Sequence, residues 1–220
     1  MVNKINVDKQ LADLINEEWH SIKPSWQYMS FTTDYYSLTK DQSRKDDIDT
    51  IRKNYGPVID TQRFTDELYH SASVKYKNVG IQSFEQIRNN PKSRYNRTFP
   101  NTARLINGLQ KKLIPPDYEI VRLMANMQLI RPEWSLNAPH PDFHDPRYIT
   151  ILYYVNDSDG DTYFFERGEC INRASPIKGS AAVYPSSLMH AGSTPTKTET
   201  RVVINMCFAP VDRKKNLVYS

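Results

Sequence analysis

The second half of the chain alternates short apolar segments with turn signals, and this pattern restricts the fold more than any other feature of the sequence. The segments are apolar or rich in β-branched and aromatic residues, and turns such as 156–160 and 176–179 separate them. The expected strands are 118–130, 148–155 (YITILYYV), 162–165, 181–184 and 201–208 (RVVINMCF). Short strands bounded by turn signals predict an all-β sandwich or barrel in this half of the chain.

The first 117 residues are more polar and carry helical periodicity. Apolar residues recur at helical spacing in 11–22, with Asp8 as the cap, and in 105–113, with Asn101 as the cap. Further helices are expected at 39–54, 61–73 and 83–89, and a strand or ordered loop at 28–36. We therefore expect an α+β, mainly β protein. A mostly helical N-terminal support region, 1–117, packs on a β core, 118–220, as one compact unit.

Composition and charge exclude several classes of protein. With 39% hydrophobic and 25% charged residues, the 220-residue chain is expected to be globular and soluble. The net charge of +4 is small and spread along the chain, so we expect no nucleic-acid partner. No apolar run approaches the roughly 20 residues of a membrane span, and the N-terminus is too polar for a signal peptide. Cys170 and Cys207 form no disulfide framework, which favours the cytoplasm.

His140, Asp142 and His190 form the most specific candidate site in the sequence. Residues i and i+2 of an extended strand point to the same face, so His140 and Asp142 can offer nitrogen and oxygen to one ion. A second imidazole from a distant strand completes a set of two histidines and one carboxylate. Such a set leaves coordination positions open, which suits non-haem Fe(II) better than structural zinc.

Each candidate residue also has a plainer interpretation when it is taken alone. His144 competes with His140 as a ligand, although its neighbour Asp145 is adjacent rather than two residues away. His20 and His70 lie in the helical half and are interpreted as structural or exposed. In the last expected strand, alternation places four residues on one face, opposite an apolar face that belongs to the core. These four residues are Arg201, Val203, Asn205 and Cys207.

Residues 140–208 resemble the 2-oxoglutarate- and Fe(II)-dependent dioxygenases of the prolyl 4-hydroxylase type. The shared elements, in the family's order and spacing, are HPD at 140–142, YYVN at 153–156, GDTYFF at 160–165, PIKG at 176–179, His190 in PSSLMHAG and Arg201 in RVVINMCF. Asp161 stands where the family often has a second glycine. The chain is most similar to uncharacterised members from bacteriophages and marine bacteria, and residues 1–117 match no motif of the family.

The resemblance implies a double-stranded β-helix (jelly-roll) core and a reaction. His140, Asp142 and His190 would bind Fe(II), while 2-oxoglutarate takes two further positions and O2 the last. Arg201 would bind the distal carboxylate of 2-oxoglutarate, with Tyr154 and Asn205 completing the co-substrate site. The expected products are a hydroxylated substrate, succinate and CO2, with ascorbate as a candidate reductant. Related halogenases lack the carboxylate ligand, so Asp142 favours hydroxylation.

Two other functions stay open from the sequence. One is a non-catalytic jelly-roll binding or virion-associated module, which would be free to lose the triad and Arg201. The other is a zinc or nickel cupin-like enzyme, although such sites usually recruit more histidines. The resemblance favours a prolyl or other protein side chain as substrate, and free amino acids, lipids and nucleobases are not excluded. The sequence does not indicate an oligomeric state.

Overall fold

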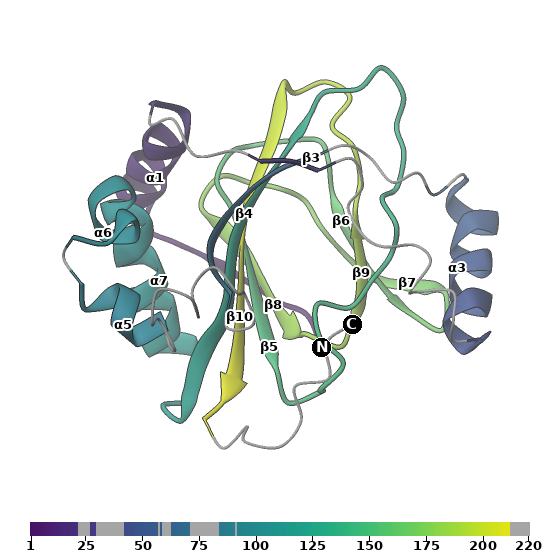
Figure 1. Ribbon diagram of the computed structural model, residues 1–220. Helices are drawn as coiled ribbons and strands as arrows, with labels where there is room; N and C mark the ends of the chain where they lie inside the picture. The colour runs from purple at the N-terminus through teal and green to yellow at the C-terminus, as the bar shows by residue number, and fades with distance from the viewer. Residues whose placement is uncertain are drawn as a thin grey trace.

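Figure 1 shows the computed structural model, which describes residues 1–21, 27–29, 42–56, 58, 63–70, 84–90 and 92–211. The described strands form two antiparallel sheets. The major sheet has the order β1 (Asn3–Asn6), β8 (Ser180–Pro185), β5 (Ile149–Tyr154), β10 (Thr200–Pro210), β4 (Tyr118–Leu129), β3 (Arg63–His70) and β2 (Gln27–Met29). The minor sheet has the order β7 (Glu169–Ala174), β6 (Thr162–Glu166) and β9 (Met189–Gly192).

The chain passes back and forth between the two sheets. After β4 in the major sheet, the chain bridges to the edge of the minor sheet through the pairs Leu136–Ser193 and His140–His190. It then returns to β5, crosses to β6 and β7, returns to β8, crosses to β9 and returns to β10. This alternation makes a double-stranded β-helix, the jelly-roll architecture that was predicted. The two sheets face each other across a common interior (Figure 1).

The two faces of β10 show how the alternating sequence produces this layering. Val202, Ile204, Met206 and Phe208 belong to the largest apolar cluster, which also contains helical residues such as Trp19 and Leu105. The other face, with Arg201 and Asn205, points between the sheets, as the hydrogen-bond partners of these residues show. The predicted division of this strand into a core face and a site face is confirmed.

The described helices cover the outer faces of the sheets (Figure 1). The helices α1 (Lys9–Ser21), α5 (Phe84–Arg88), α6 (Arg94–Thr98) and α7 (Pro100–Leu113) pack beside the major sheet, while α3 (Gln42–Tyr55) lies on the minor sheet. Ile51 of α3 packs with Phe165 and Ala191. Gly168, at φ +78°, lies in the turn between β6 and β7 and lets this turn approach α3, because a Cβ on Gly168 would lie 2.7 Å from the Thr50 Cβ. No helix among the described residues is long and apolar enough to cross a bilayer.

Glu18 links α1 to the first turn of α7. Its carboxylate accepts hydrogen bonds from the backbone N–H groups of Asn101 (2.8 Å) and Thr102 (2.9 Å) and from the Thr102 hydroxyl (2.6 Å). The neighbouring Trp19 donates its indole N–H to the same hydroxyl at 2.9 Å. Glu18 is buried, so these bonds cap α7 from another helix and fix the helical layer.

Several local predictions are wrong. A helix is expected at 61–73, but residues 63–70 form β3, which pairs with β4 from Phe64 to His70, because the open edge of β4 gives the backbone of this segment its hydrogen bonds. Residues 61, 62 and 71–73 lie outside the described residues. Asn101 does not cap α7: Phe99 is at the N-cap without a side-chain bond, and Pro100 takes the first position. By contrast, Asp8 does cap α1, since its Oδ1 accepts from the Leu11 N–H at 3.1 Å.

The other local predictions fare as follows. The helices expected at 39–54 and 83–89 correspond to α3 and α5, although residues 39–41 and 83 lie outside the described residues. Of 28–36, β2 covers 28 and 29, and the remainder lies outside the described residues. No pattern in the sequence predicted β1, β7, β9 or α6.

Replacement of Glu18 by alanine should destabilise the protein by about 1–3 kcal/mol, because it leaves buried donors at the start of α7 without an acceptor. Chemical denaturation would show this as a lower midpoint. Glu17→Ala is the matched control, since Glu17 is one residue away and exposed. Equal midpoints for the two variants would contradict the capping role.

Candidate metal centre

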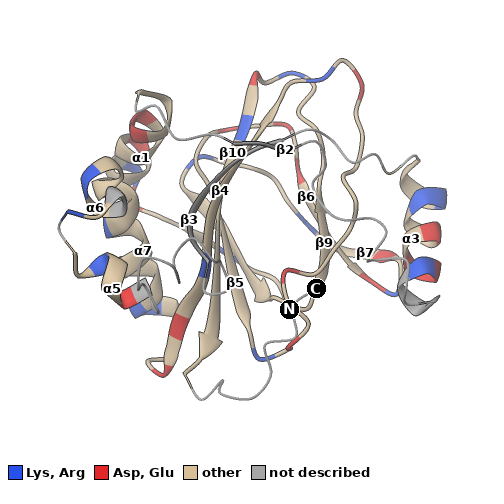
Figure 2. Cartoon of the chain, viewed as in Figure 1, with Lys and Arg blue, Asp and Glu red and all other residues tan. Residues whose placement is uncertain are grey.

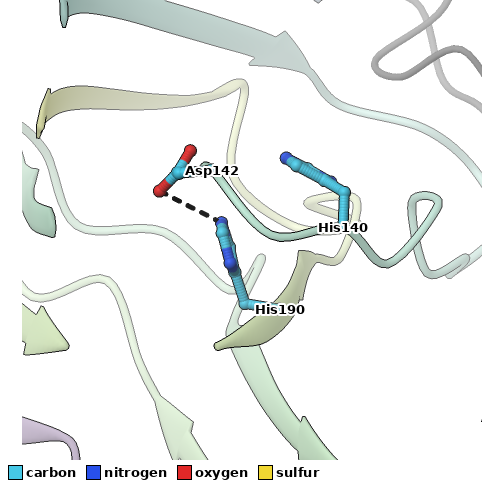
Figure 3. Close-up of side chains that lie close together, drawn as sticks. All are labelled: His140, Asp142 and His190. Carbon is cyan, nitrogen blue, oxygen red and sulfur yellow. Dashed lines mark ion pairs between the residues drawn. The ribbon is translucent and has the colours of Figure 1, made fainter. Parts of the chain in front are cut away.

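Two imidazoles and one carboxylate converge between the sheets (Figure 3). One ligand atom from each of His140, Asp142 and His190 lies within 4.8 Å of the other two. His140 and His190 exchange backbone hydrogen bonds of 2.9 and 3.0 Å, and their ring centroids are 4.9 Å apart. The Asp142 N–H donates to the Ser186 carbonyl at 2.8 Å. Backbone pairing therefore fixes all three residues, although Asp142 itself lies outside the regular strands.

Both imidazoles are oriented by backbone carbonyl groups. The Nδ1 of His140 lies 2.9 Å from the Ala138 carbonyl oxygen, and the Nδ1 of His190 lies 3.0 Å from that of Leu188. A carbonyl oxygen can only accept, so Nδ1 carries the proton in each neutral ring. Nε2 then carries the lone pair, which is the form of histidine that coordinates a metal.

The Asp142 carboxylate is buried and surrounded by donors. Thr150 Oγ1 lies 2.9 Å from Oδ2, and the Asn205 amide nitrogen lies 3.2 and 3.3 Å from the two oxygens. The Tyr184 hydroxyl lies 3.4 Å from Oδ2 and 3.4 Å from the His190 Nε2. Arg122 of β4 forms an ion pair with Oδ1 through its Nη2.

These contacts decide the protonation state of Asp142. Burial alone would raise the pKa of this carboxyl, but the Arg122 guanidinium, together with His190 and His140, outweighs burial and lowers the pKa of Asp142 below its ordinary value. The group is therefore an anion near neutral pH. An ionised carboxylate beside two imidazole nitrogens is the donor set that a divalent transition metal requires.

A second polar group surrounds Arg201. The Arg201 guanidinium donates to the Gly160 carbonyl (2.6 Å), the Gln128 side-chain oxygen (3.2 Å) and the Thr162 hydroxyl (2.8 Å). The Tyr154 hydroxyl also donates to Thr162 Oγ1, at 2.8 Å. Arg201 is buried, and burial lowers its pKa; no carboxylate among the described residues forms an ion pair with it.

Two glycines make room for this guanidinium. A Cβ at Gly192 would lie 3.3 Å from its central carbon and both terminal nitrogens, and a Cβ at Gly160 would lie 2.9 Å from the Arg201 Cδ. Gly192 follows His190 by two residues on β9, so both face the interior. Two residues of a strand span about 6.8 Å along the backbone, and the guanidinium thus packs against the same short strand that carries His190.

The structure brings together the predicted metal ligands and places the other predicted residues around them. Arg201 and Tyr154 share the Thr162 hydroxyl, whereas Asn205 contacts Asp142 itself. His144, the competing ligand, is not part of the cluster found among the described residues.

Sequence reasoning missed Arg122, Gln128, Thr162 and Tyr184 as site residues. Strand parity could have found two of them, since Arg122 and Gln128 share the face of β4 that carries Asn126.

Of the comparisons with known proteins, only the comparison with solved structures finds similar proteins. Neither family profiles nor curated proteins match the chain. Among solved structures, the chain is similar to an oxidoreductase of the 2OG-Fe(II) oxygenase family from Burkholderia pseudomallei, with 13% sequence identity. The match covers 93% of this chain and 93% of that chain, at a TM-score of 0.47. A prolyl-4-hydroxylase from Pseudomonas putida is 11% identical, with 91% of this chain and 99% of that chain covered, at a TM-score of 0.40.

A viral collagen prolyl hydroxylase from Paramecium Bursaria Chlorella virus-1 is 12% identical, with 94% of this chain and 89% of that chain covered, at a TM-score of 0.39. At such identities and TM-scores the similarity carries no argument about activity. The chemistry of the site has to supply that argument.

The protein should bind one divalent transition-metal ion per chain at this cluster. His190→Ala removes one of three ligands and should abolish stoichiometric Co(II) binding, measured by visible absorption and metal analysis. His144→Ala is the matched control and should bind like the wild type, because His144 lies outside the cluster. Loss of binding in His144→Ala together with retention in His190→Ala would show that the ligand set is wrong.

Proposed function

We propose that the protein is an Fe(II)- and 2-oxoglutarate-dependent dioxygenase that hydroxylates an organic substrate. The observation that carries the proposal is the cluster of His140, Asp142 and His190, whose ligand atoms lie within 4.8 Å of one another. Two neutral nitrogens and one carboxylate oxygen from a single side of an ion fit Fe(II) and leave positions for other ligands. When bound, the iron, 2-oxoglutarate and O2 supply the oxidation, releasing succinate and CO2.

The buried guanidinium of Arg201 supports an anionic co-substrate. A buried charge without a counter-ion is unfavourable, and a carboxylate would relieve that cost while accepting charge-assisted hydrogen bonds. The guanidinium packs against the backbone of Gly192, two residues from His190 on the same strand. A dicarboxylate with one end at the metal and the other at Arg201 fits this arrangement.

Thr162 supplies a donor to the same carboxylate in this proposal. Its hydroxyl oxygen accepts from both Arg201 and Tyr154, so its two lone pairs are occupied. The remaining hydroxyl hydrogen can then donate to an anion. In this proposal Tyr154 acts through its hydrogen bond to Thr162. Asn205 acts through its hydrogen bond to Asp142, which orients the carboxylate.

The apolar residues between the sheets would exclude water from the reaction. Leu152, Phe164, Tyr184 and Val203 form one buried cluster with Tyr154, on the interior side of both sheets. A dry interior strengthens the electrostatic interactions that hold the co-substrate and limits side reactions.

The proposal also includes the class of substrate, the reductant and the cellular compartment. We propose a protein side chain, prolyl among the candidates, because of the resemblance of residues 140–208 to prolyl 4-hydroxylases. Ascorbate is proposed as a reductant. The cytoplasm is proposed as the compartment, since both cysteines are free and reducing conditions keep iron ferrous.

With Fe(II) and O2, the protein should convert 2-oxoglutarate to succinate, and Arg201→Met should raise the Kd for 2-oxoglutarate. A charge-assisted pair is worth about 1.5–3 kcal/mol, which corresponds to about 10- to 150-fold in affinity. Arg201→Lys should recover part of the loss, because lysine keeps the charge but not the planar donor pair.

Titration calorimetry and succinate assays would measure these effects, with Arg131→Met, at an exposed arginine, as the control. An analogue of 2-oxoglutarate without the distal carboxylate should bind wild type and Arg201→Met equally. A similar loss for both ligands would refute the assignment of Arg201, and absence of succinate from the wild type would refute the proposed activity.

A further inference from the structure

The two oxygens of the Asp142 carboxylate have different surroundings. Oδ2 faces His190, at 3.7 Å from Nε2, and its close partners are neutral hydroxyl and amide groups (Figure 3). Oδ1 forms the ion pair with Arg122. The metal-facing side of the carboxylate is thus Oδ2, and a permanent cation occupies the other side.

The other contacts of Arg122 are with groups that surround this carboxylate. Its Nη1 donates to the Asp142 carbonyl at 3.5 Å, and its Nη2 reaches the Asn205 side-chain oxygen at 3.3 Å. Its Nε–H is buried without a partner among the described residues. The guanidinium stacks on Phe143, 5.0 Å from the ring centroid. Asp142 is the carboxylate with which Arg122 forms an ion pair among the described residues.

The position of Arg122 is set by the sheet rather than by the loop that carries Asp142. Arg122 lies on β4 opposite Cys207 of β10, and Asn205 follows on the same face of β10. Arg122 and Asp142 have side-chain exposures of 17% and 3%, so solvent screens their interaction little. The carboxylate is therefore held from a rigid strand.

This arrangement has opposite effects on the metal-free and the metal-bound protein. Without metal, a buried carboxylate needs a counter-ion, and Arg122 provides it. With a divalent cation on the Oδ2 side, Arg122 is a like charge close to the ion and repels it. The same residue therefore stabilises the metal-free site and weakens metal binding.

We propose that Arg122 is a positioning residue that acts as the counter-ion of Asp142, holding it as a ligand through one oxygen and keeping the site assembled before metal binds. The inference rests on the proposed function only in that Asp142 is a metal ligand. It adds a residue to the site and accounts for how a buried anion is retained when the metal is absent.

The test compares Arg122→Met and Arg122→Lys with wild type, using Mn(II) as the probe and no 2-oxoglutarate. Mn(II) affinity is measured by electron paramagnetic resonance, and Tm is measured with and without Mn(II). Arg122→Met should lower the metal-free Tm, because it leaves the buried Asp142 carboxylate without its counter-ion. At a pH high enough to ionise Asp142 in both proteins, Arg122→Met should bind Mn(II) about tenfold more tightly, since it removes one unit charge near the ion. Its Tm should therefore rise more on Mn(II) addition than the Tm of wild type.

Arg122→Lys keeps the charge, so it should stay close to wild type in affinity and recover part of the metal-free stability. Arg147→Met is the matched control: it breaks the exposed pair with Asp145 and should leave Mn(II) affinity unchanged. Equal or weaker Mn(II) binding by Arg122→Met at the pH where Asp142 is ionised in both proteins, or an equal fall in Tm with and without metal, would overturn the proposal. Failure of wild type itself to bind metal would instead refute the proposed function, and the inference with it.

Discussion

The site depends on one buried carboxylate. Asp142 is almost completely buried, so its ionisation relies on Arg122 and on the hydrogen bonds of Thr150 and Asn205. These partners come from β4, β5 and β10, three adjacent strands of the major sheet. The two imidazoles come from the minor-sheet side. The metal centre is therefore a product of the two-sheet architecture, because neither sheet carries the whole set.

The same architecture separates metal binding from co-substrate binding, the two functions proposed for the interior. Asn205, near the middle of β10, contacts the proposed metal ligand Asp142, and Arg201, the proposed co-substrate residue, lies at the start of the same strand. Buried apolar side chains lie beside these polar groups on the interior faces of the two sheets. Basic and acidic residues are interspersed along the described parts of the chain (Figure 2), so binding selectivity is expected to come from the interior groups rather than from the overall charge.

Sequence patterns were informative where one physical effect dominates. Alternation on 201–208 predicted both faces of β10, and the spacing of His140 and Asp142 with His190 predicted the ligand cluster. The prediction of a helix at 61–73 was wrong because the edge of β4 offers pairing that local propensity cannot show. Asn101 was a suitable cap by type, but Glu18, 83 residues earlier, supplies the acceptor. Arg122 was overlooked because its role depends on a long-range pair with Asp142.

The most direct test of the central claim is absorption spectroscopy under anaerobic conditions, with Fe(II) and 2-oxoglutarate added separately and together. If the triad and Arg201 form one site, a visible charge-transfer band should appear only when Fe(II) and 2-oxoglutarate are both present. The band should be absent from His140→Ala and should need a higher 2-oxoglutarate concentration in Arg201→Met. A wild-type protein that binds Fe(II) and 2-oxoglutarate without developing this band would contradict the account, because the two would then occupy separate sites.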